Sequence, residues 1–368
     1  MLIYEIEIFK SRIKLSEPFK ISLGIMDYAE NIIVKIISDN GLVGFGECSP
    51  FRTINGESMD TGFIVGQYIG KVLIGKSPIE MEECVNLMNK VIFGNSSIKS
   101  AFDMALFDIA SQHAKLPLYK FIGGNNSKQI ITDYTVSLDS PEKMANDAVK
   151  IKNKGFGIIK VKLGGSREED LERIKQIRTQ IGYDIPLRID ANQGWDCQTA
   201  VEILKDLESY NIQHCEEPIP RWDFMNLPFI KKNSLMPIMA DESCCDHHDA
   251  ARLIGLDACH RFNIKLGKSS GIFNALKIIR LAEHADIPVQ IGGFLESRLG
   301  FTASAHVSLS NDIIKYFDFD TPLMFEEDPV TGGISYGENG LITLPDTIGL
   351  GASFDESYLQ NLPRVSIH

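Results

Sequence analysis

The stretch that decides the fold is residues 158–190, IIKVKLGGSREEDLERIKQIRTQIGYDIPLRID. A β-rich run, Ile158–Lys162, is followed by a helical pattern over Glu168–Ile181 and by a second β-rich run, Leu187–Asp190. Two such runs joined by a helix are typical of a parallel βα unit, because parallel strands need a crossover connection. The carboxyl ends of parallel strands share one edge of a sheet, and both runs end in a charged residue.

The same unit repeats from about residue 130 onward, with further helical stretches such as Thr199–Tyr210. The β-rich runs are Thr132–Val136, Ile158–Lys162, Leu187–Asp190, Ile212–Glu216, Pro237–Ala240, Phe262–Lys265, Val289–Ile291 and Ile313–Asp318. Eight strands alternating with helices predict an α/β fold, a parallel (β/α) barrel of the TIM type.

The residues before the barrel predict an α+β domain. Its alternating stretches predict strands at Leu2–Ile8, Ile32–Ile37 and Leu42–Glu47, and its clearest helical pattern runs from Ile98 to His113. Two polar segments, Glu17–Tyr28 and Ser49–Glu57, predict loops that serve as connections or as lids.

These patterns divide the chain into three parts. We expect an α+β domain over residues 1–125, the barrel over 126–324, and a Gly-rich segment over 325–368 that returns to the first domain.

Bulk composition excludes several classes of protein. The net charge of −12 disfavours nucleic acid and anionic membranes as partners, because both repel an acidic surface. No apolar stretch is long enough for a membrane span, and the first ten residues predict a strand instead of a signal peptide. The seven cysteines show no metal-binding spacing and predict reduced thiols, so a cytoplasmic protein is expected.

Charged residues end successive predicted strands. They are separated by 28, 26, 25 and 24 residues up to the sixth strand, which is one βα unit each time: Lys162, Asp190, Glu216, Asp241 and Lys265, with Asp318 two units further on. In a parallel barrel these ends converge on one mouth, where barrel enzymes carry their catalytic groups.

Three of these residues are acids on consecutive strands, Asp190, Glu216 and Asp241. Carboxylates brought together repel one another, and a cation would keep them ionised. An all-oxygen ligand set without His or Cys favours Mg²⁺. Glu216 is the preferred ligand on its strand, although Glu217 would replace it if the strand ended one residue earlier.

Three lysines are expected in the same mouth. Lys160 and Lys162 lie two residues apart on one strand face, and Lys265 lies across the barrel. Repulsion between Lys160 and Lys162, together with a nearby metal, would lower the pKa values of these two lysines towards the range where one can act as a base. Two bases on opposite faces of one carbon suit a racemase or epimerase, and salt bridges to the carboxylates are the alternative role.

Together these residues resemble the enolase superfamily, and within it the muconate-lactonising subgroup. The resemblance rests on the motifs Lys160-Val161-Lys162, Asp190-Ala191-Asn192, Glu216-Glu217-Pro218, Asp241-Glu242-Ser243 and Asn263-Ile264-Lys265. It implies a capping domain made from both chain ends, and Lys162 and Lys265 as the acid/base pair. Lys160 would tune the charge.

The resemblance also implies supporting and substrate-binding residues. Asn192, Glu242 and Asn263 would hold ligands and bases in place, whereas Thr135 and Ile54 would contact substrate. Superfamily branches that dehydrate acid sugars carry a histidine on the seventh strand, and none is present here. The family tends to form homo-oligomers.

Asp318-Phe319-Asp320 resembles the Asp-x-Asp signature of dipeptide epimerases, in which two carboxylates suit an α-ammonium group. The implied reaction is a Mg²⁺-dependent 1,1-proton transfer at the α-carbon of the second residue, with L-Ala-D/L-Glu the leading substrate. The first lid has no arginine for a glutamate side chain, and Lys20 or Arg52 would serve instead.

Three alternatives stay open: a muconate cycloisomerase, an o-succinylbenzoate synthase, and an inactive metal-binding barrel.

Overall fold

An eight-stranded parallel sheet forms the larger part of the structure, a computed structural model that describes residues 1–368. Its strands lie in chain order: β5 (Tyr134–Val136), β6 (Ile159–Lys162), β7 (Leu187–Asp190), β8 (Ile212–Glu216), β9 (Ile238–Ala240), β10 (Arg261–Lys265), β11 (Val289–Gly292) and β12 (Ile314–Phe317). The prediction of eight parallel strands is confirmed, and no strand end differs from its predicted position by more than two residues.

The sheet curls until its two edge strands meet. The backbone N–H of Asp133, just before β5, donates to the carbonyl of Phe317 on β12 at 3.4 Å. The N–H of Phe319 donates to the hydroxyl of Thr132 at 2.7 Å. These contacts bring the first and last strands together, as a (β/α) barrel requires.

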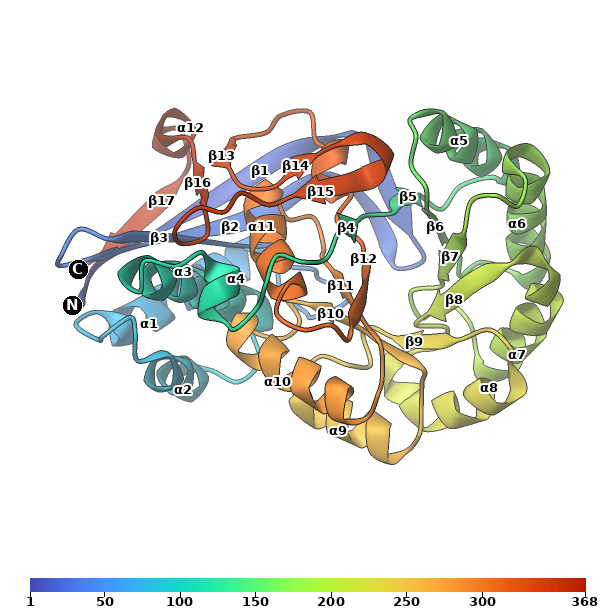
Figure 1. Cartoon of the computed structure of the whole chain (residues 1–368), viewed down its shortest axis with the longest axis horizontal. Coiled ribbons are helices and arrows are strands. Elements are labelled where there is room, and N and C mark those ends of the chain that lie inside the picture. Colours follow the sequence, from blue (N-terminus) through green and yellow to red (C-terminus); the bar gives the residue numbers. More distant parts are fainter.

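Seven helices connect the barrel strands: α5 (Pro141–Asn153), α6 (Arg167–Ile181), α7 (Cys197–Asp206), α8 (Leu227–Asn233), α9 (His247–Gly255), α10 (Ile272–His284) and α11 (Arg298–Ser308). Figure 1 shows α5 to α10 lying around the outside of the strands. Several begin at a side-chain cap: Ser166 and Asp196 accept hydrogen bonds from the backbone N–H groups of Glu169 and Thr199.

A second, antiparallel sheet has four strands in the order β17-β1-β2-β3, and the tip of its β1–β2 hairpin reaches the barrel mouth. Its strands are β1 (Ile3–Ile21), β2 (Gly24–Ser38), β3 (Val43–Cys48) and β17 (Arg364–Ile367). Because β17 pairs with β1, the two chain termini lie close together (Figure 1). The remaining tail contains β13 (Val330–Gly332), β14 (Ser335–Tyr336), β15 (Leu341–Thr343), β16 (Ala352–Phe354) and α12 (Glu356–Gln360), and β15 also pairs with β4 (Ile130–Ile131).

The prediction of a loop over Glu17–Tyr28 is wrong. This segment is the tip of the β1–β2 hairpin, where Phe19 pairs with Met26 and a two-residue turn follows Ile21. Its polar composition suggested a loop, but cross-strand backbone hydrogen bonds hold it extended, with a register irregularity before Phe19. The second segment, Ser49–Glu57, contains no strand or α-helix, as predicted.

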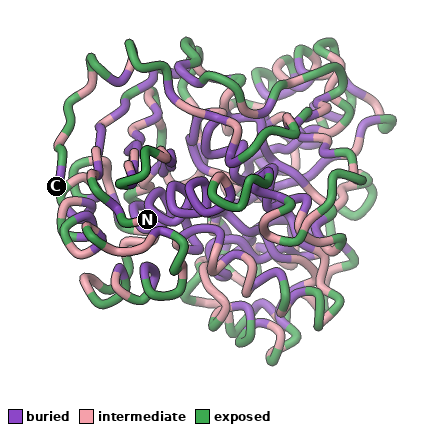
Figure 2. Tube along the Cα trace, turned by 60° about the vertical axis from the view of Figure 1, so that its left-hand side comes forward, coloured by how far each residue is buried: buried purple, intermediate pink, exposed green.

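Helices α1 (Met59–Leu73) and α3 (Ser96–His113) pack against this sheet, α2 (Met81–Val91) packs on these two helices, and α4 (Leu118–Phe121) leads to the barrel. Most of α3 is buried, and a Cβ added to Gly44 or Gly46 of β3 would overlap carbonyl oxygens of the helix. Glycine therefore permits the close approach of strand and helix. Figure 2 shows the buried residues concentrated in the interior of the molecule, where the apolar ones form two main clusters of 67 and 20 residues.

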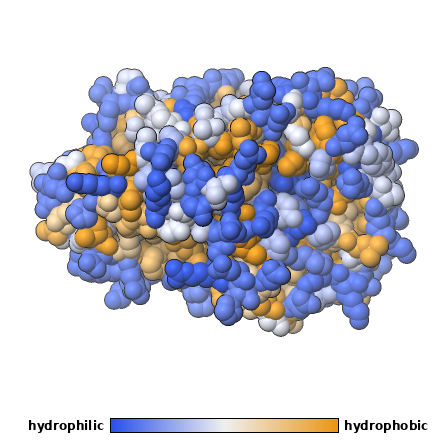
Figure 3. All heavy atoms as spheres, in the orientation of Figure 1, coloured by the Kyte–Doolittle hydropathy of each residue, from blue (hydrophilic) through white to orange (hydrophobic).

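The face shown in Figure 3 carries mostly polar side chains, with apolar ones between them. No helix has both the length and the apolar character needed to cross a bilayer. All seven cysteines are free thiols.

Candidate active site

The predicted metal-binding acids lie at the C-terminal ends of neighbouring strands. Lys162 on β6 is opposite Asp190 on β7, and Asp190 is opposite Glu216 on β8. Asp241 follows directly after β9, which ends at Ala240. The three acids are completely buried. The structure therefore brings together carboxylates that the sequence separates by one βα unit each.

Two lysines of β6 neutralise part of this acidic cluster. The ammonium nitrogen of Lys160 lies 3.0 Å from Asp190 and 2.9 Å from Glu216, whereas that of Lys162 lies 2.7 Å from Asp190. Both side chains are buried. Buried charges persist only when they are paired, so these ion pairs fix the positions of both lysines.

Asp241 is held by two further lysines. Lys265 Nζ lies 2.8 Å from its Oδ2, and Lys268 Nζ contacts its Oδ1. Lys268 also donates to the backbone carbonyl of Asn263 at 3.0 Å. Lys268 was not among the predicted site residues; its only sequence signal is its position three residues after Lys265, at the mouth of the barrel.

The lysine pKa values differ from the expectation. Burial disfavours the ammonium form of Lys160, but the charges of Asp318 and Glu216 outweigh burial and raise its pKa well above the usual value. For Lys265 burial is likewise outweighed, mainly by Asp241, and its pKa is raised. Carboxylates surround Lys160 and Lys265 and raise both values, whereas the lowering expected for Lys160 and Lys162 rests also on the charge of a bound cation and stays a prediction.

The pKa values of the acids are shifted in opposite directions. Burial alone would raise the pKa of Asp190, but Lys162 and Lys160 hold it well below its usual range. Burial and the charge of Asp190 raise the pKa of Glu216 to about 7. A divalent cation would keep all the acids ionised.

The chemistry of this donor set fits Mg²⁺. The predicted ligands Asp190, Glu216 and Asp241 offer oxygen atoms alone, they are fully buried, and they come from three successive strands of a rigid barrel. Oxygen donors with net negative charge suit a hard cation that retains positions for water or substrate oxygens.

A small cavity, here called the inner cavity, lies beside these acids and has a volume of about 40 Å³. Both predicted bases line it, from strands four places apart in the eight-stranded sheet. Its lining residues are Phe19, Ile21, Phe51, Ile54, Thr135, Lys162, Asn192, Lys265, Gly293, Phe294, Leu295, Asp318, Asp320 and Thr321. Lids and barrel strands thus contribute to one chamber that holds two lysines and two aspartates.

Asp318 and Asp320 lie at one end of the inner cavity, just past the end of β12. Asp318 accepts a hydrogen bond from Lys160 at 2.8 Å. Asp320 accepts one from the backbone N–H of Thr135 at 2.6 Å. Burial and the charge of Asp318 raise the pKa of Asp320 to about 7. A bound cation would favour the ionised form of both.

A third acid, Asp133, adjoins this pair and was missed by the sequence argument. Carboxylate oxygens of Asp133, Asp318 and Asp320 lie within 4.8 Å of one another, a tighter grouping than that of the three predicted metal ligands. Asp133 is completely buried and pairs with Arg188 at 2.7 Å. Its only sequence signal is that it immediately precedes β5. This end of the cavity therefore attracts cations.

The three predicted supporting residues contact the lysines and acids. Lys162 donates to the side-chain oxygen of Asn192 at 3.1 Å, and the amide nitrogen of Asn192 donates to Glu242 at 3.2 Å. The amide nitrogen of Asn263 donates to Glu216 at 2.8 Å. Hydrogen bonds of this kind orient ligands and bases.

Two other residues complete the surroundings of the acids. Gln290 lies on β11, the strand without a histidine, and donates to Glu216 at 3.2 Å. The carboxylate of Glu217 accepts the backbone N–H of Asp241 at 2.7 Å and the hydroxyl of Ser243. Glu217 therefore holds the turn after β9, whereas Glu216 points towards the lysines.

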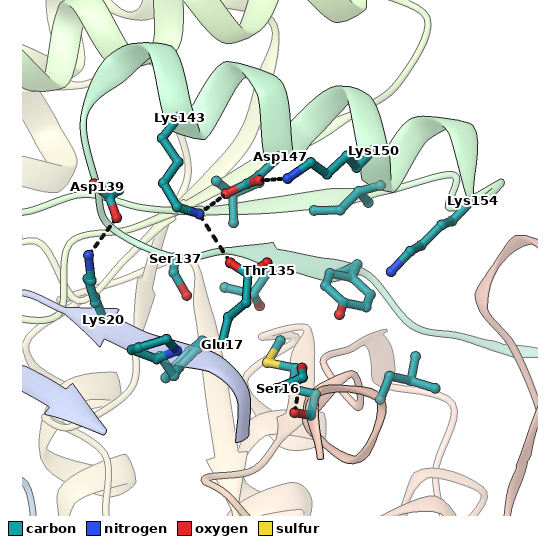
Figure 4. Close-up of a pocket in the computed structure, with 17 residues that line it drawn as sticks. Ser16, Glu17, Lys20, Thr135, Ser137, Asp139, Lys143, Asp147, Lys150 and Lys154 are labelled. Carbon is teal, nitrogen blue, oxygen red and sulfur yellow. Dashed lines mark hydrogen bonds and ion pairs between the residues drawn. The ribbon is translucent and has the colours of Figure 1, made fainter. Parts of the chain in front are cut away.

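The two cationic lid residues are not brought into the inner cavity. Lys20 extends to Asp139, 2.6 Å away (Figure 4). Arg52 is exposed and lies 3.5 Å from Glu30. Ile54, by contrast, is buried and lines the cavity.

Fold and site together define a barrel enzyme whose bases and acidic ligands converge at the C-terminal ends of its strands. Residues 3–123 match the N-terminal domain of the mandelate racemase / muconate lactonizing enzyme family, and residues 143–358 match the enolase C-terminal domain-like family. The chain belongs to the mandelate racemase / muconate lactonizing enzyme family of the enolase superfamily.

Three similar proteins act on dipeptides. A D-Ala-D/L-Ala epimerase of Cytophaga hutchinsonii is 60% identical, with 100% of each chain covered. Its structure with Mg and D-Ala-L-Val matches with a TM-score of 1.00. A hydrophobic dipeptide epimerase of Enterococcus faecalis is 38% identical over 96% of this chain and 100% of the relative. An L-Ala-D/L-Glu epimerase of Bacillus subtilis is 38% identical over 95% and 96%.

Proposed function

We propose that this protein is a magnesium-dependent dipeptide epimerase that inverts the α-carbon of the second residue. The observation that carries the proposal is the inner cavity, which holds two lysines from opposite sides of the barrel together with an aspartate pair. A substrate with both an acidic α-carbon and an ammonium group matches this combination.

Lys162 and Lys265 act as the base and the acid of the reaction. Because β6 and β10 lie four places apart in the barrel, the two lysines approach the α-carbon from opposite faces. The lysine that begins neutral removes the proton from one face. The other lysine begins as an ammonium and delivers a proton to the opposite face, which inverts the configuration.

Asp190, Glu216 and Asp241 would hold the Mg²⁺ ion. When bound, the ion would neutralise the negative charge that develops on the substrate carboxylate as the α-proton leaves. Lys160 contacts two of these acids and adds positive charge on the same side. Lys268 and Asn263 keep the acids in place.

The Asp318/Asp320 pair supports a dipeptide over the other substrates of the subgroup. A free α-ammonium would pair with both carboxylates in a buried site, where charge-assisted hydrogen bonds are strong. Muconate cycloisomerases and o-succinylbenzoate synthases bind no amine and have no need of the pair. An inactive binding barrel would have no need of two opposed lysines.

The second residue of the dipeptide is best matched by a small uncharged side chain. Phe51, Ile54, Phe294 and Leu295 line the inner cavity, and Lys20 and Arg52 do not. L-Ala-D/L-Glu is the second candidate, because several relatives of 30% to 38% identity are epimerases of that dipeptide.

We also propose a domain organisation and a cellular location for this protein. We assign residues 1–125 to a capping domain, 126–324 to the catalytic barrel, and 325–368 to a segment that completes the cap. The pairing of β17 with β1 supports this division. The proposed protein is a cytoplasmic homo-oligomer that binds neither nucleic acid nor membranes, consistent with its net charge of −12.

The test is a screen of dipeptide pools with enzyme and Mg²⁺ in D₂O, read by mass spectrometry. The pools pair L-Ala or D-Ala with each common second residue. Deuterium gain by dipeptides with small uncharged second residues is expected. Deuterium gain by none of them, with properly folded and Mg²⁺-loaded protein, would refute the proposed function.

A further inference from the structure

A second hollow adjoins the inner cavity. This outer groove, of about 360 Å³, lies between the β1–β2 hairpin tip and the 49–57 loop, and it opens at the surface. Phe51 and Leu295 line both the inner cavity and the outer groove. These two side chains therefore form a wall between the inner cavity and the outer groove, whose volume is about nine times larger.

The wall is firmly held. The backbone N–H of Leu295 donates to Ser49 at 3.2 Å, and its carbonyl accepts the amide of Asn31 at 2.7 Å. The Phe51 ring packs on that of Phe294, with centroids 5.6 Å apart. Phe51 and Leu295 are thus both held by neighbouring residues, and a larger ligand could displace them only at a cost in packing energy.

The loop that carries Phe51 is also attached to the barrel. The carbonyl of Phe51 accepts the N–H of Asn55 at 3.0 Å, which closes a compact turn. Arg221, from the barrel, donates to the carbonyl of Ile54 at 2.8 Å. Two hydrogen bonds, one within the turn and one to the barrel, therefore hold the loop that places Phe51 beside the inner cavity.

The proposed function determines which part of the substrate faces this wall. The ammonium group would lie at Asp318 and Asp320, and the reacting α-carbon between Lys162 and Lys265. The second side chain must then occupy the remaining apolar lining. Lys265 Nζ lies 4.9 Å from the Phe294 ring, so this ring lies beside that base, and the Phe51 ring packs on Phe294.

We propose that Phe51, together with Leu295, restricts the second residue of the dipeptide to small side chains. This inference rests on the proposed function. Removing the Phe51 ring would join the inner cavity to the outer groove, and a large second side chain would extend into the groove. A packed wall of this kind discriminates by size, because each added methylene must displace fixed neighbours.

The test compares Phe51→Ala with the wild-type holoenzyme on L-Ala-L-Ala and L-Ala-L-Tyr. The ratio of kcat/KM for the tyrosine dipeptide to that for the alanine dipeptide should rise at least about tenfold in the variant. Thr53→Ala is the matched control, because Thr53 lies in the same loop and lines the outer groove but not the inner cavity. Its ratio should stay at the wild-type value.

A second variant, Phe51→Leu, tests the same proposal if the Phe51→Ala variant fails to fold. It should raise the ratio by a smaller factor while it keeps the wild-type melting temperature. If the wild-type enzyme turns over L-Ala-L-Ala but the ratio is unchanged in a folded variant, the proposed size restriction by Phe51 is wrong. The proposed function is then unaffected. Failure of the wild-type enzyme on every dipeptide would overturn both.

Discussion

Lys162 and Lys265 face the same inner cavity from strands four places apart, and each ammonium group is paired with a different buried carboxylate. Lys162 lies 2.7 Å from Asp190, and Lys265 lies 2.8 Å from Asp241. Both bases are thereby tied to acids that we assign to the metal. The charge of the metal site and the protonation of the bases are consequently coupled.

The first prediction concerns the metal. Asp190→Asn removes one negative oxygen from the donor set and should weaken Mg²⁺ binding at least about tenfold, as measured by titration calorimetry. Asp139→Asn is the control, because that acid pairs with Lys20 outside the inner cavity. Equal Mg²⁺ affinity in wild type and Asp190→Asn would contradict the assignment. Chelated protein should be inactive and recover with Mg²⁺.

The second prediction separates the two bases. Lys162→Ala and Lys265→Ala should each lower epimerisation by at least roughly 10²-fold, the usual contribution of a positioned acid or base. Each variant should still exchange the α-proton of one stereoisomer in D₂O, since the remaining lysine faces one side of the carbon. Exchange of both stereoisomers at wild-type rates in either variant would remove that lysine from the reaction.

The third prediction concerns the ammonium site. Asp320→Asn should lower kcat/KM for a dipeptide roughly ten- to hundredfold, which corresponds to about 1.5–3 kcal/mol of lost charged hydrogen bonding. N-acetylation of the substrate should abolish turnover by the wild type, because it removes the positive charge. An acetylated dipeptide that reacts as fast as the free one would show that the Asp318/Asp320 pair has another role.

The fourth prediction concerns pH and stability. Asp103 of α3 accepts the backbone N–H of Phe273 at the start of α10, and burial raises its pKa to about 8. The folded state therefore retains a proton that the unfolded chain releases at much lower pH. Its stabilising contribution is complete below about pH 4 and is lost as the pH rises through about 8.

The substitution Asp103→Asn should weaken the dependence of the free energy of unfolding on pH. Between pH 5 and 8 the free energy of unfolding of the wild type should fall relative to the variant by up to about 1.4 kcal/mol per pH unit. Urea unfolding of both proteins over this range measures the difference. Parallel curves would show that Asp103 is ionised in the folded protein.

Most of the barrel could be predicted from the sequence because each strand is short and β-rich, and six of the eight end in or are followed directly by a charged residue. Lys162, Asp190 and Glu216 are adjacent in the ladder because regular βα units bring strand ends into register. The hairpin tip at Glu17–Tyr28 escaped prediction, since its strands are held by backbone pairing that polar side chains do not reveal.

The rest of the site depends on contacts that no local pattern encodes. Asp133 precedes its strand, yet it reaches Asp318 and Asp320 because the first and last strands meet. The sequence predicts Lys20 as a partner for an acidic substrate, but in the structure Lys20 pairs with Asp139, a contact between segments far apart in the chain. Phe51 of the 49–57 loop packs on Phe294 of the barrel, and a contact between residues so far apart in the chain leaves no local sequence pattern.

The most direct test of the central claim is proton NMR of L-Ala-L-Ala and D-Ala-L-Ala with Mg²⁺-loaded enzyme in D₂O. The two-lysine account predicts inversion at the second α-carbon, with deuterium in the epimerised product at that carbon and a protonated first α-carbon throughout. Deuterium at the first α-carbon, or inversion that retains the original hydrogen in most of the product from the first turnover, would contradict it.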